Sequence, residues 1–217
     1  MADNETVITE PVNGSGVVNA DNVVTGAPRI NGGIYRAPKG TPVPTDATSP
    51  LDSAFENMGY ISDEGVVNSS NKTSTDIKEW GGAVVKTVGT GLKDTYKQKF
   101  IEALNPVVLE TTYGKGNVTV ADDGSIAIKS GAVDTGEAVY VIDEVNGDRL
   151  YRTVIPRGTI ESIGDITHKP DTPKGYELTI ACGRDSAGYT HYEYYSAPIE
   201  DEETQEEEDT TTGGGEG

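Results

Sequence analysis

Apolar and polar side chains alternate along several segments of the chain, and this alternation limits the fold more strongly than any other sequence feature. In residues 92–101, Tyr96, Gln98 and Phe100 fall on one face of an extended chain. The opposite face carries Lys93, Thr95, Lys97 and Lys99. A period of two is typical of a β-strand with one buried face. The sequence therefore predicts a mainly β protein.

Turn residues divide this β texture into hairpins. Glycines at positions 89 and 91 predict a turn, so that residues 83–101 would form one long hairpin. Asn146-Gly147 is the strongest hairpin signal, because this dipeptide favours turns whose twist matches that of the strands. The other predicted strands are residues 137–144 and 148–155 beside this turn, residues 159–167 paired with residues 176–182, and a short edge at residues 191–195.

One helix is predicted after the long hairpin. Asn105 is a suitable N-cap, and Pro106 fits a first helical turn, where its missing N–H costs nothing. Gly114 is a suitable end for this helix. Its predicted apolar side comprises Val107, Val108, Leu109 and Tyr113. A shorter helical turn is expected at residues 51–58.

The two ends of the chain are more acidic than its middle. The formal net charge is −19; residues 1–28 hold four acids, residues 200–217 hold nine, and neither segment contains Lys or Arg. Residues 29–199 keep 23 acids against 17 Lys and Arg, a net charge of −6. Polar, charged segments bury too little apolar surface to fold alone. We expect a flexible arm at residues 1–28, a β domain at residues 29–199 and a disordered acidic tail at residues 200–217.

Several functional classes are disfavoured. An acidic chain does not bind nucleic acid by neutralising phosphates. The histidines, His168 and His191, have no second His or Cys at ligand spacing, which argues against a metal site. Cys182 lies on the apolar face of a predicted strand and is interpreted as a small buried hydrophobe rather than a nucleophile. We expect neither an enzyme nor a bound cofactor.

The start of the chain is acidic and lacks the basic and apolar regions of a secretory signal. No run approaches the ~18 apolar residues of a membrane span. We therefore expect a protein made in a cytoplasm and not held in a membrane.

Several sequence blocks resemble the major tail proteins, the tail-tube subunits, of bacteriophages with long non-contractile tails. The blocks are GIYRAPKGTPVPTD at 33–46, FENMGYISDEGV at 55–66, IKEWGG at 77–82, FIEALN at 100–105 followed by YG at 113–114, VIP at 154–156 and GYELT at 175–179. Each block alone is weakly specific, but their order over residues 30–195 is fairly specific.

The resemblance implies a β-sandwich or partial barrel with one flanking α-helix. It also implies hexameric rings of identical subunits that stack into a tail tube, the conduit through which double-stranded DNA passes into the host without being specifically bound. The implied partners are copies of the chain itself, the tape measure protein, the tail terminator and tail tip proteins. The implied location is the virion tail, after synthesis in the host bacterial cytoplasm.

Candidate functional residues fall into two groups. The candidate subunit or ring interface comprises Trp80, Lys93, Lys97 and Lys99. Trp80 has two interpretations, a core or rim anchor at the base of the hairpin or an interface anchor, since aromatic residues dominate contact energies. The lysine stripe is either a solvated face or a surface that meets acids of a neighbouring subunit.

The candidate lumen-facing residues are Glu161, Asp165 and Glu177. Residues 159–167 and 176–182 would place these acids on one surface, away from the apolar face of the second strand. Such a wall would repel phosphates weakly; the alternative is that these acids face solvent outside the tube.

The competing function for the whole chain is a non-polymerising β-sandwich binding module, such as a virion decoration protein or an adhesin.

Overall fold

The computed structural model describes residues 23–29, 33–131 and 134–199. Most of the predicted N-terminal arm, residues 1–22, and the whole predicted acidic tail, residues 200–217, lie outside the described residues. The described end of the arm contains strand β1 (Ala27–Pro28), which pairs with a strand of the main sheet.

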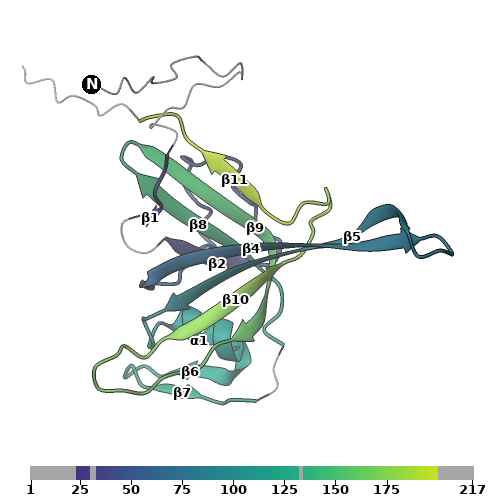
Figure 1. Cartoon of the computed structure of the whole chain (residues 1–217). Helices are drawn as coiled ribbons and strands as arrows, with labels where there is room; N and C mark the ends of the chain where they lie inside the picture. The colour runs from purple at the N-terminus through teal and green to yellow at the C-terminus, as the bar shows by residue number, and fades with distance from the viewer. Residues whose placement is uncertain (1–22, 30–32, 132–133, 200–217) are drawn as a thin grey trace, which may run out of the picture.

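A single antiparallel sheet of nine strands forms most of the molecule (Figure 1). Neighbouring strands follow the order β3-β2-β8-β9-β10-β5-β4, while β1 adds to β8 and β11 adds to β9. Besides β1, its strands are β2 (Ile34–Pro38), β3 (Glu56–Asn57), β4 (Ile61–Lys78), β5 (Val84–Phe100), β8 (Ala138–Asn146), β9 (Arg149–Ile163), β10 (Tyr176–Cys182) and β11 (Tyr192–Tyr195). The prediction of a mainly β fold is confirmed, and the curled, open sheet matches a partial barrel.

One helix and a small second sheet lie at one end of the curled sheet (Figure 1). The helix is α1 (Pro106–Tyr113), followed by the 3-10 turn η2 (Lys115–Asn117) and by the hairpin of β6 (Val118–Val120) and β7 (Ile126–Ile128). No helix among the described residues is long and apolar enough to span a membrane.

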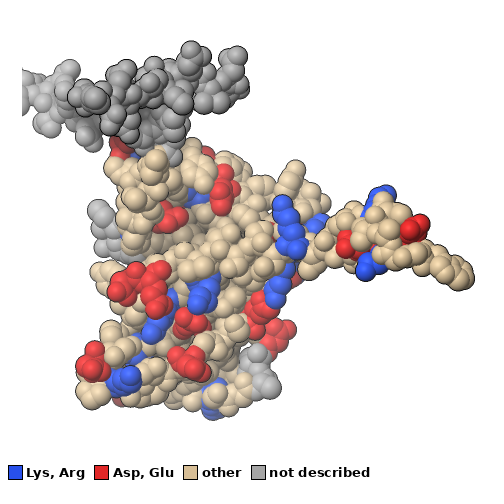
Figure 2. Space-filling model, in the orientation of Figure 1, with Lys and Arg blue, Asp and Glu red and all other residues tan. Residues whose placement is uncertain are grey.

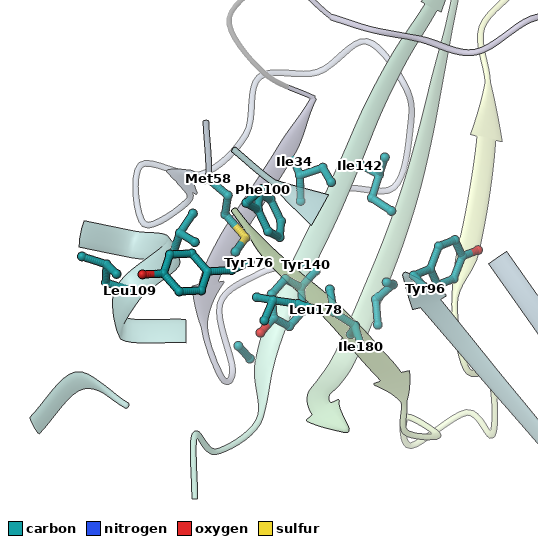
Figure 3. Close-up of a cluster of buried hydrophobic side chains, with 13 residues drawn as sticks. Ile34, Met58, Tyr96, Phe100, Leu109, Tyr140, Ile142, Tyr176, Leu178 and Ile180 are labelled. Carbon is teal, nitrogen blue, oxygen red and sulfur yellow. The ribbon is translucent and has the colours of Figure 1, made fainter. Parts of the chain in front are cut away.

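The core lies inside the curl, where side chains from both halves of the sheet meet α1 (Figure 3). It includes Ile34 of β2, Phe100 of β5, Tyr140 of β8, Leu178 of β10 and Leu109 of α1, each at most 1% exposed. The predicted alternation holds at β10, where Tyr176, Leu178 and Ile180 are buried. It also holds at the root of β5, where residues 94, 96, 98 and 100 are buried.

The helix prediction is confirmed in its boundaries and its caps. The Asn105 side chain accepts a hydrogen bond from the Val107 N–H at 3.0 Å, and the Gly114 N–H donates to the Glu110 carbonyl at 2.8 Å. Gly114 has a φ of 87°, which glycine adopts without strain.

The predicted helical turn at residues 51–58 is wrong. The Asp52 carboxylate instead accepts the Ala54 N–H at 2.9 Å, and the Phe55 N–H donates to the Asp52 carbonyl at 3.0 Å. This local turn delivers the chain directly into β3, which pairs with β2. An Asp side chain that bonds its own backbone competes with helix formation, which explains the error.

The turn predicted at residues 89–91 is also wrong. β5 runs without interruption and pairs along its length with β4, and the turn lies between them, at residues 79–83. The ladder pairs Thr73 with Gly91 and Ser74 with Gly89, so Thr90 is an extra residue on β5. Gly89 and Gly91 therefore flank a β-bulge rather than a turn.

The strands predicted at residues 148–155 and 159–167 are one strand, β9, which ends at Ile163. The ladder between β9 and β8 is irregular at one point. Between the pairs Tyr140–Ile155 and Ala138–Gly158, β9 has one residue more than β8. Pro156 lies within this irregularity, where the missing N–H breaks no regular ladder bond. The predicted pairing of this segment with β10 and the hairpin at Asn146-Gly147 are confirmed.

A buried ion pair connects the centre of the sheet to the loop at residues 39–50. Arg152 of β9 binds Asp143, its cross-strand partner on β8, through Nε–Oδ1 at 2.7 Å and Nη2–Oδ2 at 2.8 Å. Its Nη1 donates to the carbonyls of Asp46 at 3.1 Å and Ser49 at 2.8 Å. The Arg152 side chain is 1% exposed and that of Asp143 6%. The guanidinium thus satisfies a carboxylate and two loop carbonyls at once.

Replacing Arg152 with Met should lower the free energy of unfolding by about 3–5 kcal/mol, because the buried Asp143 would keep only the longer, 3.9 Å contact with the half-exposed Arg29. Urea unfolding of the unassembled subunit measures this loss. The matched control is Arg157→Met, which breaks the more exposed pair with Glu137 and should leave the unfolding midpoint nearly unchanged. Equal losses in the two variants would contradict this role for Arg152.

Candidate functional site

The hairpin of β4 and β5 projects far beyond the body of the molecule (Figure 1). Every residue from 67 to 92 is exposed, and we call this segment the projecting hairpin. An isolated two-stranded hairpin is marginally stable in water. Contact with another surface would therefore stabilise this segment.

Large apolar side chains are exposed along the projecting hairpin. They are Val67, Ile77, Trp80, Val84, Val85, Val88 and Leu92. Trp80 lies in the turn at the tip, and its side chain is fully exposed. The interpretation of Trp80 as a core or rim anchor at the base of the hairpin is therefore wrong, because the hairpin turns at Trp80 rather than at residues 89–91.

The candidate lysines and two of the candidate acids share one face of the sheet. β10 lies between β9 and β5. Lys93 of β5 forms an ion pair with Glu161 of β9 across β10, and Lys97 Nζ lies 3.6 Å from Glu177 Oε2 of β10. We call the surface formed by Lys93, Lys97, Lys99, Glu161 and Glu177 the charged face. The lysine stripe and two of the three acids, predicted separately, thus share one surface.

Asp165 does not belong to a strand, contrary to the prediction. The last ladder contact of this segment is the Gly164 N–H, which donates to the Glu177 carbonyl at 2.8 Å, and the chain then enters a loop. That loop contains Pro170 and Pro173, and Pro173 precedes β10 by only three residues. Asp165 and Lys99 form no ion pair within the part of the chain that the structure describes.

Basic and acidic groups are interspersed on this side of the molecule (Figure 2). The pairs on the charged face are partly exposed: the side-chain exposures are 57% for Lys93 and 36% for Glu161. Each pair therefore adds little stability, but together they neutralise the lysines locally. The face has three lysines against two acids, a formal net charge of +1.

A polar cluster fixes the root of the projecting hairpin. Thr190, just before β11, donates a hydrogen bond to the buried Asp94 of β5. His191 Nδ1 lies 3.7 Å from Asp94 Oδ2, and the imidazole packs edge-on against Tyr96 at a centroid distance of 5.5 Å. The cluster links two segments 96 residues apart and positions the hairpin relative to the body.

The described ranges contain no candidate metal centre. No group of three or more His, Cys, Asp or Glu side chains there is placed to hold a metal ion. Burial raises the pKa of the Cys182 thiol to about 12, so the thiolate, the reactive form, is scarce at neutral pH.

Sequence reasoning missed β4 and therefore the length and position of the projecting hairpin. Residues 67–78 are exposed on both faces, so no alternation of apolar and polar residues marks them as a strand. The sequence does contain one signal for this hairpin. Gly81-Gly82 is a dipeptide that favours hairpin turns, and it lies between two segments of similar length. Gly82 has a φ of 90° at this turn.

A protein-family model described as "Phage tail tube protein" matches residues 17–204 of the chain. No curated protein matches it in sequence.

Reversing one charge of the Lys93–Glu161 pair should destabilise the subunit slightly, and exchanging both should restore it. Lys93→Glu places two carboxylates together, whereas Lys93→Glu with Glu161→Lys rebuilds the pair in the opposite sense. We expect a coupling energy below about 1 kcal/mol from thermal and urea unfolding of the four proteins in the cycle. Lys99→Glu is the control and should show no coupling to Glu161→Lys; equal coupling at both lysines would contradict a specific pair.

Proposed function

The chain belongs to the phage tail tube protein family, and we propose that its subunits form hexameric rings that stack into the tail tube of a phage with a long non-contractile tail. It is a structural, non-enzymatic protein, and membership of the family implies self-assembly and a place in the virion tail. We further propose synthesis in the cytoplasm of the host bacterium and contacts with the tape measure, tail terminator and tail tip proteins.

The projecting hairpin carries this proposal. It exposes seven large apolar residues, whose exposed fractions run from 37% at Leu92 to full exposure at Trp80. Fully burying one such side chain contributes about 1.5–3 kcal/mol, so a neighbouring subunit that covers the hairpin gains considerable stability. A binding module without polymerisation would leave this surface in water at every concentration.

We propose that the charged face lines the lumen, with Glu161 and Glu177 toward the tube axis and Asp165 at the edge of the same surface. The ion pairs with Lys93 and Lys97 support a nearly neutral wall, because lysines already bound to acids have less charge to offer phosphates. A wall that releases few counterions binds DNA weakly, which suits a conduit. The alternative role of the lysine stripe, contact with a neighbouring subunit, then falls mainly to Lys99.

The purified protein should form rings or tubes at high concentration in negative-stain electron micrographs, and Trp80→Ala should reduce their formation at least about tenfold. The same variant should unfold at an unchanged urea concentration, because Trp80 is fully exposed in the subunit.

Trp80 is also the single tryptophan, so its fluorescence reports on the tip directly. A soluble quencher should reach Trp80 in the subunit but not in tubes. A wild-type protein that remains monomeric at all concentrations would contradict the proposed function, and quenching that is equal in both states would contradict burial of the tip.

A basic lumen should hold DNA. Glu161→Lys with Glu177→Lys turns the charged face strongly positive, so we expect its tubes to retain DNA in a salt-dependent manner, whereas wild-type tubes should not. A cryo-electron microscopy map of the wild-type tube tests the assignment directly. Side chains of Glu161 and Glu177 that point away from the axis, or a net basic wall, would refute it.

A further inference from the structure

A cavity of about 210 Å³ lies at the root of the projecting hairpin, between residues 24–26 and strands β4, β5, β8, β9 and β11. This is the volume of about seven water molecules. Two acids, Glu144 and Glu193, and the tyrosines Tyr96, Tyr151 and Tyr195 contribute to its lining. The cavity is thus both acidic and aromatic; Asn68, at the base of the projecting hairpin, borders it, and no residue of the charged face does.

Two buried groups in this cavity lack a partner within the described chain. The hydroxyls of Tyr96 and Tyr151 accept and donate no hydrogen bond there, although these residues are only 4% and 8% exposed. A buried hydroxyl without a partner costs free energy, so such groups are normally satisfied by a ligand, a water molecule or another chain. Both hydroxyl oxygens are closed off from solvent, so an occupant of the cavity reaches them only if the tyrosine side chains move.

The acids of the cavity are also incompletely paired. Neither Glu144 nor Glu193 forms an ion pair with a Lys or Arg of the described residues; Glu193 accepts a hydrogen bond from Tyr195 and lies 3.7 Å from His191 Nε2. Burial, and secondarily the charge of Glu193, raises the pKa of Glu144. A positively charged group between the two acids would give both carboxylates an ion-pair partner and would offset their mutual repulsion.

No Lys or Arg side chain in the remaining segments of the same chain can supply this cation. Residues 1–22, 30–32, 132–133 and 200–217 contain neither Lys nor Arg. The tip of the projecting hairpin can supply it. Lys78, the last residue of β4, forms no ion pair with any described residue and lies two positions from the fully exposed Trp80.

We propose that the cavity receives the hairpin tip of a second copy of this chain, with the Lys78 ammonium between Glu144 and Glu193 and the Trp80 ring against the tyrosines at the rim. The contact is intermolecular, because the hairpin projects away from the body that holds the cavity (Figure 1). Aromatic stacking and a charge-assisted contact complement each other in such a site. The proposal rests on the proposed function and names the surface that the hairpin meets.

Disulfide trapping tests the contact in assembled wild-type-like tubes. In a Cys182→Ala background, Lys78→Cys with Glu193→Cys should give a ladder of cross-linked subunits after mild oxidation of tubes, and only monomers after oxidation of dilute subunits. The matched control is Lys78→Cys with Asp171→Cys, whose second cysteine lies in the exposed loop between β9 and β10. Thermal unfolding of each variant before oxidation verifies that it is folded.

Charge exchange provides a second, independent measurement. Lys78→Glu should raise the concentration needed for tube formation at least about tenfold, and adding Glu193→Lys should restore most of the loss. Lys86→Glu is the control, since Lys86 is also on the projecting hairpin but farther from the tip, and it should have a much smaller effect.

The outcomes separate this inference from the proposed function. Tubes that form normally but do not cross-link at positions 78 and 193, or that cross-link equally at 78 and 171, would overturn the docking site and leave the tube function standing. A cross-link from position 193 to a cysteine placed in residues 1–22 instead would assign the cavity to the chain's own N-terminal segment and also overturn it. A wild-type protein that forms no rings or tubes would contradict the function itself.

Discussion

The β8–β9 hairpin is the centre from which the remaining sheet is built, and Arg152 is the group that holds it to the surrounding chain. β1 and β2 pair with β8, whereas β10 and β11 pair with β9, so an error at this hairpin would displace strands on both sides. A guanidinium has five donors in a rigid plane, and here they reach a carboxylate and two loop carbonyls. The long proline-rich loop is thereby fixed through two backbone carbonyls, and the Asp46 carboxylate, which accepts hydrogen bonds from Thr48 and Ser49, shapes the turn that presents them. A lysine has the charge but not the geometry to do this.

The accuracy of sequence reasoning followed the distribution of burial. Where one face of a strand is buried, as at Tyr176, Leu178 and Ile180, alternation marked the strand and its inward side correctly. Where local hydrogen bonds decide the outcome, as at the Asn105 cap, the residue types were sufficient for the helix. The projecting hairpin has no buried face, so its strand β4 left no pattern to detect. Glycines also occur in two different structures on this hairpin. They flank the bulge at Thr90 and form the turn at Gly82, and composition alone does not distinguish the two.

The candidate functional residues were predicted as individual side chains more accurately than as surfaces. Lys93, Lys97, Glu161 and Glu177 all point outward from the core, as expected from alternation. Their mutual contacts depend on β10 lying between β5 and β9, a neighbour relation that no local pattern encodes. The acidic cavity has the same origin, because Glu144, Tyr96 and Glu193 come from three strands far apart in sequence. Long-range strand order, rather than residue chemistry, was the missing information.

The extra residue at Thr90 reverses the parity of strand β5. Near the root, odd-numbered residues such as Lys93 and Lys97 occupy the outer face, but from the bulge to Lys86 the even-numbered residues continue that face, because Gly91 pairs with Thr73 whereas Gly89 pairs with Ser74. Lys86 and Val88 therefore extend the surface on which Lys93 lies. Removal of Thr90 alone would turn the distal side chains of this strand over while the core contacts at the root stayed intact. One residue thus sets the orientation of the outer half of β5 independently of the domain that carries it.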